Sequence, residues 1–464
     1  MIVDNRVHKQ EELQTKFNHK QWALLRDRLS HQSVKELCED KNNPNLLIFP
    51  HCLNNRRKEF YDAHICEIVN NTLTTGNLMG FVGVSSDKTS VELSIRSRFQ
   101  HNGEDDHFLH YMLQKVFHIN ILQLPTSGGN NDAFEFILFH LFTHYLKKAI
   151  KQGLFKQYRK CEYNDANVRG VIDIPRHIRY NMPFNGKVAY RTSEYKYDNP
   201  VTQLIRHTIE YIRCSHVAGN VLKCDKNTSD AVRTIYDITT SYNANDRQRI
   251  ISQNLKPVKH PFYTQYTFLQ RLCLHILRHK KMSYSQSEHK VFGILFDGAW
   301  LWEEYLATIL VEQGFIHAVK EEKNGFKMYS GGHMRYPDFY NRDRQMILDA
   351  KYKRLDMCVQ RDDLYQMISY IHTMDIDSGN AQDIKGVFVF PYSSNDSENK
   401  NIKPVLKELY GRGGYWGIFP VEIPTRDNIK YAEFCEQMQK CEESMCDRIY
   451  ALRPKEGDKI ETEE

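Results

Sequence analysis

The stretch that decides the fold of the carboxyl-terminal part reads Arg335-Tyr-Pro-Asp338-Phe-Tyr-Asn-Arg-Asp-Arg-Gln-Met-Ile-Leu-Asp349-Ala-Lys351. It predicts two strands, at 334–340 and 345–352, joined by a short polar turn. Pairing of these strands would bring Asp338 beside Asp349. Because successive strand residues face opposite sides, Asp349 and Lys351 share one face. The sequence therefore predicts two carboxylates and one ammonium group at the same end of a hairpin.

This set of groups suits the metal-assisted hydrolysis of a phosphodiester. Mg²⁺ prefers carboxylate oxygens and keeps several of its water ligands. Such an ion polarises the phosphate and makes a bound water more acidic. Lys351 would orient or deprotonate that water and balance the charge on the phosphate. Taken alone, the residues leave open a plainer interpretation, a surface hairpin that carries a salt bridge.

The helix predicted before the hairpin, at 297–311, adds a third carboxylate. Glu303 precedes Leu306 by three residues and Leu310 by seven, so it lies along an otherwise apolar face. A carboxylate in that position needs a partner, and either a metal centre or a basic side chain would serve.

The helix predicted after the hairpin runs from Asp362 to about Thr373. Gln366 and Tyr370 are four residues apart and therefore meet on one face of it. Polar side chains there suit contact with Lys351 or with a DNA backbone. Ordinary residues at the edge of a buried face would show the same spacing.

Composition narrows the class of protein. The 464 residues carry 63 Lys and Arg against 58 Asp and Glu, a net charge of +5 that permits contact with a polyanion without requiring it. Apolar residues make up 41% and aromatic residues 12%, which excludes a largely disordered chain. The 11 cysteines include no Cys-x-x-Cys pair, which argues against a disulfide framework and suits a reducing cytoplasm.

Several functional classes find no support. The sequence contains neither the Gly-x-x-x-x-Gly-Lys-Ser/Thr loop of nucleotide hydrolases nor the Gly-x-Ser-x-Gly turn of serine hydrolases. The richest apolar stretch, 133–142, is ten residues long and too short to cross a bilayer. We therefore expect a cytoplasmic protein without a membrane segment.

The pattern of elements predicts an α+β chain of several domains. Residues 1–105 are expected to form a mixed α/β domain suited to docking a partner, with strands at 46–49, 79–84 and 90–96. Residues 106–284 are expected to be mostly helical. Residues 285–452 are expected to hold the chemistry, with short strands at 315–319 and 326–329 around the turn Asn324-Gly325. Residues 453–464 form a charged tail that we expect to be disordered.

Four blocks of the carboxyl-terminal part resemble the McrC family, the nuclease subunits of the McrBC modification-dependent (type IV) restriction systems. They are Phe296-Asp-Gly-Ala-Trp-Leu-Trp-Glu303-Glu-Tyr-Leu, Pro337-Asp338, Ile347-Leu-Asp349-Ala-Lys351-Tyr-Lys and Asp363-Leu-Tyr-Gln366-Met-Ile-Ser-Tyr370. The middle region is also similar, through Val168-Arg-Gly170-Val-Ile-Asp173 and Tyr197-Asp-Asn199-Pro-Val-Thr-Gln-Leu-Ile-Arg206. The likeness begins near Asp106 and is weak before it.

The resemblance implies a PD-(D/E)xK restriction-endonuclease-like α/β core in residues 285–452. Asp338 and Asp349 would bind Mg²⁺, Lys351 would be catalytic, and Glu303 would be an auxiliary acid at the metal. Gln366 and Tyr370 match the Gln-x-x-x-Tyr element of related nucleases and would contact DNA.

The resemblance also implies a partner, an McrB-like AAA+ GTPase hexamer that reads the modified base. The McrC subunit stimulates this GTPase and cuts double-stranded DNA after translocation, which fits the lack of a P-loop here. Two other functions stay open: a stand-alone PD-(D/E)xK nuclease in repair or phage defence, and a nuclease-like adaptor that activates a ring NTPase. The modest net charge argues against the first and the complete Asp338, Asp349 and Lys351 set against the second.

Overall fold

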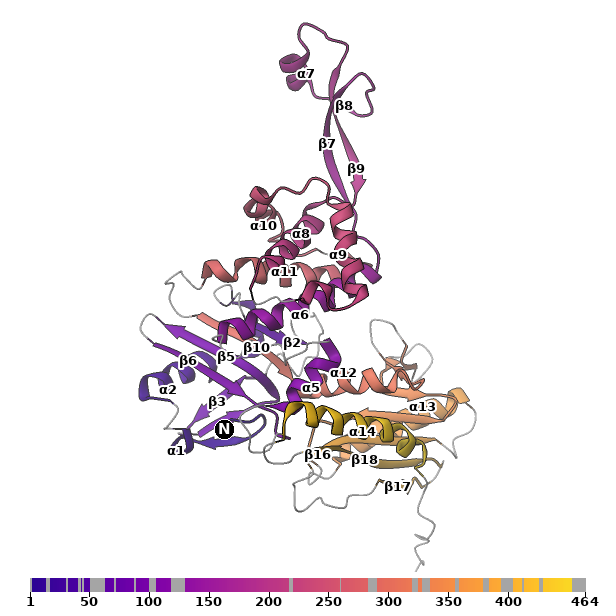
Figure 1. Ribbon diagram of the computed structural model, residues 1–464. Coiled ribbons are helices and arrows are strands. Elements are labelled where there is room, and N and C mark those ends of the chain that lie inside the picture. Colours follow the sequence, from indigo (N-terminus) through magenta and orange to yellow (C-terminus); the bar gives the residue numbers. More distant parts are fainter. Residues whose placement is uncertain are drawn as a thin grey trace, which may run out of the picture. The chain divides into compact units, whose positions relative to one another are not determined.

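The chain divides into two compact units in a computed structural model (Figure 1). One unit comprises Met1–Ile121 and Ser287–Glu464, and the other comprises Leu122–Gln286. The structure describes residues 2–13, 17–30, 32–40, 43, 46–50, 63–70, 72–86, 89–99, 106–117, 130–216, 220–258, 260–282, 290–318, 324–327, 334–354, 359–378, 384–393, 404–410, 413–424 and 429–452. The tail expected at 453–464 lies outside these residues.

The first unit contains a four-stranded sheet with the strand order β2-β10-β5-β6. Its strands are β2 (Leu46–Phe49), β5 (Leu78–Ser86), β6 (Thr89–Ile95) and β10 (Lys290–Asp297). The first three confirm strands expected from the sequence. β10 was not expected, and it lies in the stretch assigned to the nuclease domain. It runs parallel to β2 and antiparallel to β5, and its apolar residues complete the core of this sheet.

The two central strands of this sheet each contain a glycine that their pairing requires. Gly293 on β10 and Gly80 on β5 have φ angles of +148° and +125°. A Cβ atom on Gly293 would lie 2.2 Å from the carbonyl oxygen of Phe81. Only glycine fits these positions, because L-residues rarely adopt such φ angles and the opposing backbone leaves no room.

A second, smaller sheet and short helices cover the amino-terminal core. The sheet has the order β1-β4-β3, and all of its pairs are antiparallel. The elements are β1 (Val7–Lys9), α1 (Gln10–Leu13), α2 (His19–Leu25), a π-helical turn Arg26–Ser30, α3 (Val34–Glu39), β3 (Cys66–Val69) and β4 (Thr72–Thr75). Leu25, Leu29 and Leu37 are fully buried in the same core as Val82 and Leu295.

The carboxyl-terminal part contains a six-stranded sheet with the order β11-β14-β15-β16-β18-β17. Its strands are β11 (Ile316–His317), β14 (Phe339–Asn341), β15 (Met346–Ala350), β16 (Lys385–Ser393), β17 (Val405–Glu408) and β18 (Tyr415–Ile423). β15, β16 and β18 are parallel neighbours, whereas β14 and β17 join the sheet antiparallel. Three helices accompany it: α12 (Gly298–Leu310), α13 (Arg361–Ser378) and α14 (Tyr431–Tyr450).

The faces of the sheet decide which side chains meet α13. Ile347 on β15 and Phe388 on β16 pack with Met367 and Ile371 of α13 in one buried cluster. Asp349 follows Ile347 by two residues and therefore projects from the same face. α14 lies on the opposite face, since its Arg448 covers the ring of Phe419 on β18.

The two short strands expected around Asn324-Gly325 are present as β11 and as β12 (Phe326–Lys327). Among the described residues they do not pair with each other. β11 pairs with β14, and β12 pairs with β13 (Met334–Arg335). The physical reason lies in the apolar side chains, because Phe326 is buried in the cluster below α13 together with Tyr340.

The boundary expected between 105 and 106 does not separate two compact units. α5 (His107–Phe117) begins just after it and packs on α12 and α14. Tyr111 of α5 and Tyr305 of α12 both donate hydrogen bonds of 2.8 Å to Glu442 of α14. Together with β10, these contacts place the amino-terminal and carboxyl-terminal segments in one unit.

The second unit is built from helices and one long hairpin. The helices are α6 (Asn130–Lys151), α8 (Pro200–Arg213), α9 (Lys226–Ile238), α10 (Arg247–Gln253) and α11 (Thr264–Met282). Asn199 caps α8 through Val201 N–H and Thr202 N–H, and Pro200 occupies its first turn, as the Asn-Pro pair predicts. α11 packs against α6 and α8.

The hairpin extends from the helices of this unit and carries small elements at its far end (Figure 1). We call residues 157–196 the arm. It consists of β7 (Gln157–Asp165), β8 (Val171–Ile172), α7 (Ile174–Asn181) and β9 (Val188–Lys196). β7 and β9 pair over their whole length, from Gln157 opposite Lys196 to Asp165 opposite Val188. None of the described helices has the length and apolar character that crossing a membrane requires.

Candidate active site on the carboxyl-terminal sheet

The hairpin expected from the Pro-Asp and Asp-x-Lys spacing is present. β14 and β15 pair antiparallel, with Phe339 opposite Leu348. Asp338 immediately precedes β14, and its Oδ2 accepts a hydrogen bond of 2.7 Å from the backbone N–H of Ala350. The carboxylate of Asp338 is thereby fixed beside the residue between Asp349 and Lys351. The sequence prediction that the two acids and the lysine converge is confirmed.

Lys351 lies between two carboxylates. Its Nζ is 2.7 Å from Oδ2 of Asp349 and 3.0 Å from Oδ1 of Asp363, which lies in the first turn of α13. Burial alone would lower the pKa of the Lys351 ammonium group, but these two carboxylates outweigh it and raise the pKa above its ordinary value. Lys351 is therefore a cation at neutral pH.

Asp349 is the most deeply buried acid of the site, with 4% of its surface exposed. Burial raises the pKa of its carboxyl group; the nearby Lys351 opposes that shift, and the charges of Asp363 and Glu303 add to it. Its Oδ2 contacts Nζ of Lys351 at 2.7 Å. Because a carboxylate oxygen has two lone pairs, this buried oxygen keeps acceptor capacity beside Lys351, which is what a metal ligand requires.

Gln366 and Tyr370 join this site from α13. The side-chain amide of Gln366 donates a hydrogen bond of 2.6 Å to the Tyr370 hydroxyl, which in turn donates to the backbone oxygen of Tyr336 at 3.2 Å. Burial raises the pKa of Tyr370 to about 12; the hydrogen bond from Gln366 opposes this, and the charges of Asp349 and Asp338 contribute to it. The expected meeting of Gln366 and Tyr370 is confirmed, and Tyr370 lies close to both acids.

Glu303 has a partner that the sequence did not indicate. Its Oε1 lies 3.1 Å from Nε2 of His317 on β11, and the His317 ring stacks on Phe339. Glu303 is close enough to Asp349 to raise its pKa. Within the described part of the chain, no three His, Cys, Asp or Glu side chains are already grouped for a metal ion. The metal role assigned to Asp338, Asp349 and Glu303 therefore stays a prediction.

Asp363 is the site residue that sequence reasoning missed. It contacts Lys351, and its Oδ2 also lies 3.0 Å from Nζ of Lys353. Burial would raise the pKa of this carboxyl group, but the two lysines prevail and lower it. Its position in the first turn of the helix after Asp-x-Lys was a usable signal, because acids are favourable at helix amino termini.

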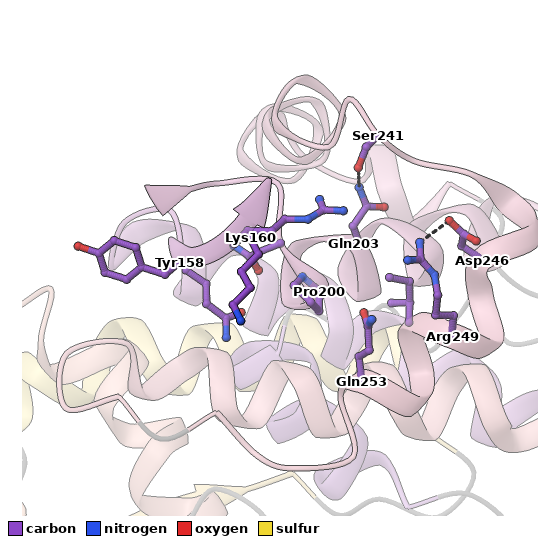
Figure 2. A pocket seen from close by; sticks show the side chains of 12 residues that line it. Tyr158, Lys160, Pro200, Gln203, Ser241, Asp246, Arg249 and Gln253 are labelled. Carbon is purple, nitrogen blue, oxygen red and sulfur yellow. Dashed lines mark hydrogen bonds and ion pairs between the residues drawn. The ribbon is translucent and has the colours of Figure 1, made fainter. Parts of the chain in front are cut away.

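A separate cavity of about 300 Å³ lies in the second unit, where the arm meets the helices (Figure 2). Polar and basic side chains line it, among them Lys160, Gln203 and Arg249. Arg249 is paired with Asp246 at 2.6 Å. This cavity does not contain the grouping of carboxylates and lysine found on the sheet.

The far end of the arm is apolar and exposed. We call residues 168–184 the arm tip. Its large apolar side chains are all more than two-fifths exposed, and Val171 reaches 80%. They are Val168, Val171, Ile172, Ile174, Ile178, Tyr180, Met182 and Phe184. Several exposed apolar side chains within one short segment are typical of a surface that binds another protein.

Comparison with known proteins gives one family. Residues 73–391, more than half of the 464, match the family described as "McrBC 5-methylcytosine restriction system component". One similar solved structure is a half-complex from a tetradecameric assembly of Thermococcus gammatolerans McrB AAA+ hexamers with bound McrC. The match has 15% identity and a TM-score of 0.44, and it covers 97% of this chain and 99% of that chain. Another is the Thermococcus gammatolerans McrBC complex, with 14% identity and a TM-score of 0.30. The match covers 67% of this chain and 86% of that chain. No curated protein matches the chain.

Proposed function

The chain belongs to the family of McrBC 5-methylcytosine restriction system components, and on that premise we propose that it is the DNA endonuclease subunit of such a system. In this proposal it is Mg²⁺-dependent, acts on DNA with modified cytosine, and works with a GTP-driven partner. The observation that carries the proposal is the convergence of Asp338, Asp349 and Lys351 at the β14–β15 hairpin. The mixed sheet with helices on both faces supports a PD-(D/E)xK core.

Asp338 and Asp349 are the residues that would hold the metal ion. Both present carboxylate oxygens, the donors that Mg²⁺ prefers. The acceptor capacity of the buried Asp349 Oδ2 supports this assignment. Glu303 is the further acid, and His317 is its partner in this structure. When bound, the ion polarises the phosphate and makes a water molecule more acidic.

Lys351 acts as a cation in this mechanism. Its raised pKa keeps it protonated at neutral pH, so it stabilises charge on the phosphate and orients the attacking water. Of the two roles that the sequence suggested, deprotonation of the water is therefore the less favoured. Asp363 holds the Lys351 ammonium group in place from α13.

Gln366 and Tyr370 would contact or orient the DNA at the site. With a pKa of about 12, the Tyr370 hydroxyl keeps its proton and orients Gln366 through their hydrogen bond. Gln366 is exposed, so its amide is accessible to a phosphate oxygen of the backbone.

An AAA+ GTPase supplies the motor in this proposal. The given sequence contains no P-loop, so the proposal assigns GTP hydrolysis to another chain. The arm tip provides a surface for such a partner, because eight large apolar side chains are exposed there. We therefore place the contact with an McrB-like hexamer at the arm tip and expect GTPase stimulation through it.

A plasmid cleavage assay tests the proposal. Plasmids with and without 5-methylcytosine are incubated with the chain, with and without its McrB-like partner, GTP and Mg²⁺. We expect double-strand cleavage only of modified DNA and only with all components. Mg²⁺-dependent cleavage without partner or GTP would instead show a stand-alone nuclease. GTPase stimulation without any cleavage would show an adaptor.

In the same assay, Phe184→Ser at the arm tip should weaken GTPase stimulation and cleavage together.

Asp363→Asn is expected to reduce cleavage without abolishing it. The variant removes one of the two carboxylates that hold Lys351, so Lys351 is positioned by Asp349 alone. We expect a loss of roughly tenfold in the single-turnover rate. Asp362→Asn is the matched control, because Asp362 is the exposed neighbour in the same helical turn. Equal rates for the two variants would show that the Asp363 ion pair plays no part in cleavage.

A further inference from the structure

The chain immediately after Lys351 is anchored in the amino-terminal region. Lys351 and Lys353 both reach Asp363 on α13, at 3.0 Å in each case. Tyr352 between them points elsewhere, since its hydroxyl lies 2.7 Å from Oγ of Ser97, which follows β6. Side chains of this segment therefore alternate in direction. Lys351 and Lys353 face the active site, whereas Tyr352 faces Ser97, which lies 255 positions earlier in the sequence.

Tyr352 is buried, with apolar side chains around its ring and polar partners at its hydroxyl. Only 4% of its surface is exposed, and its ring meets Phe99 edge to face with centroids 5.0 Å apart. Its hydroxyl lies 3.1 Å from Sδ of Met79 on β5. A Cβ on Gly298, the first residue of α12, would come within 2.5 Å of the Tyr352 ring. The ring therefore packs directly on the start of the helix that carries Glu303.

A buried ion pair supports the same segment. Arg98 contacts Asp4 through its backbone N–H at 2.6 Å and through Nε at 2.9 Å. The exposed fraction is 6% for the Arg98 side chain and 0% for that of Asp4. The Arg98 guanidinium lies over the Tyr352 ring, 4.9 Å from its centroid, and its Nη1 is 3.5 Å from the Tyr352 carbonyl oxygen. Arg98 also reaches Oδ1 of Asn77 at 2.6 Å, and Asn77 accepts the N–H of Gly298.

We propose that Asp4, Ser97, Arg98 and Tyr352 form a positioning cluster for the nuclease site. The cluster fixes the backbone at residue 352, and the neighbouring lysines are thereby held at the distance that Asp349 and Asp363 require. The amino-terminal region is then part of the nuclease site, in addition to any role in docking a partner. This inference rests on the proposed function, because the activity it tunes is the cleavage assigned to Lys351.

Kinetics provide the first test. Tyr352→Phe removes the hydroxyl that contacts Ser97 and keeps the ring, so we expect kcat for cleavage to fall about tenfold while KM for DNA stays unchanged. Tyr111→Phe is the matched control, because it also removes a buried tyrosine hydroxyl bond, to Glu442, but does not touch residues 351–354. Its kcat should stay within about twofold of wild type at a similar melting temperature. Equal kcat values for the two variants would overturn the proposal.

Hydrogen exchange separates failure of this inference from failure of the proposed function. Backbone exchange is measured by mass spectrometry on wild type, Arg98→Met and Arg98→Lys, without DNA or partner. We expect faster exchange in peptides covering 346–354 in Arg98→Met, partial recovery in Arg98→Lys, and unchanged exchange in β18. Unchanged exchange at 346–354 would overturn the positioning role whether or not the protein cuts DNA. If exchange responds but no variant or wild type cleaves, the anchor stands and the nuclease assignment fails.

Discussion

Asp349→Asn should abolish DNA cleavage while leaving the protein folded. The amide keeps the size of the side chain but removes the charge that orients Lys351 and that, in the proposed mechanism, would hold Mg²⁺. We expect the single-turnover rate to fall on the order of a thousandfold or more, because metal binding and charge stabilisation are lost together. The measurement is cleavage of modified plasmid with the partner, GTP and Mg²⁺ present.

Stability provides the internal control for this variant. Burial raises the pKa of Asp349, so the folded protein keeps a charged group there at a cost. The neutral amide avoids that cost, and Lys351 keeps a second carboxylate partner in Asp363. The melting temperature in chelator should therefore be no lower than that of wild type. GTPase stimulation should also persist, because the arm tip lies in the other unit. Cleavage by Asp349→Asn at the wild-type rate would show that the hairpin is only structural.

Lys351→Met should abolish cleavage and also make stability depend on pH. The methionine keeps the length of the aliphatic chain but leaves Asp349 buried beside Asp363 without the cation between them. Removing one partner of a buried ion pair costs about 3–5 kcal/mol of unfolding free energy. The pKa of Asp349, already raised by burial, should rise further because Lys351 no longer opposes the shift.

The sign of the pH dependence follows from proton binding. A raised folded-state pKa means that the folded protein binds the proton more tightly than the unfolded chain does. Stability of Lys351→Met should therefore fall as pH rises from the ordinary carboxyl range through the raised pKa, and recover on acidification. Denaturant unfolding in chelator at pH 5 and pH 8 measures this. Adding Asp349→Asn should restore stability at pH 8. If the single variant has the same stability at both pH values, Lys351 does not compensate a buried Asp349 charge.

The sequence carried enough information to locate the centre of the site. Asp338, Asp349 and Lys351 lie within a short stretch in which period-two alternation and one polar turn set the geometry. Gln366 and Tyr370 meet for the same kind of reason, since helical spacing alone puts them on one face. The roles of these residues in metal binding and catalysis remain predictions, because they depend on ligands and not on the fold.

The partners of these residues could not be read from local patterns. His317 approaches Glu303 only because β11 joins the sheet beside β14. Asp363 reaches Lys351 because α13 packs on the face that carries Asp349. β10 was missed since a short, continuous apolar run does not distinguish a central strand from other buried structure.

The amino-acid sequence by itself determined the local elements, the grouping of two acids with a lysine, and the family to which the chain belongs. The tertiary structure alone decided that residues 1–121 and 287–464 form one unit, and that Arg98 and Asp4 support the segment at Tyr352, just after β15. The physical reason is separation along the chain. Spacing rules fix which neighbours share a face, whereas contacts between residues more than 250 positions apart depend on how whole sheets and helices pack.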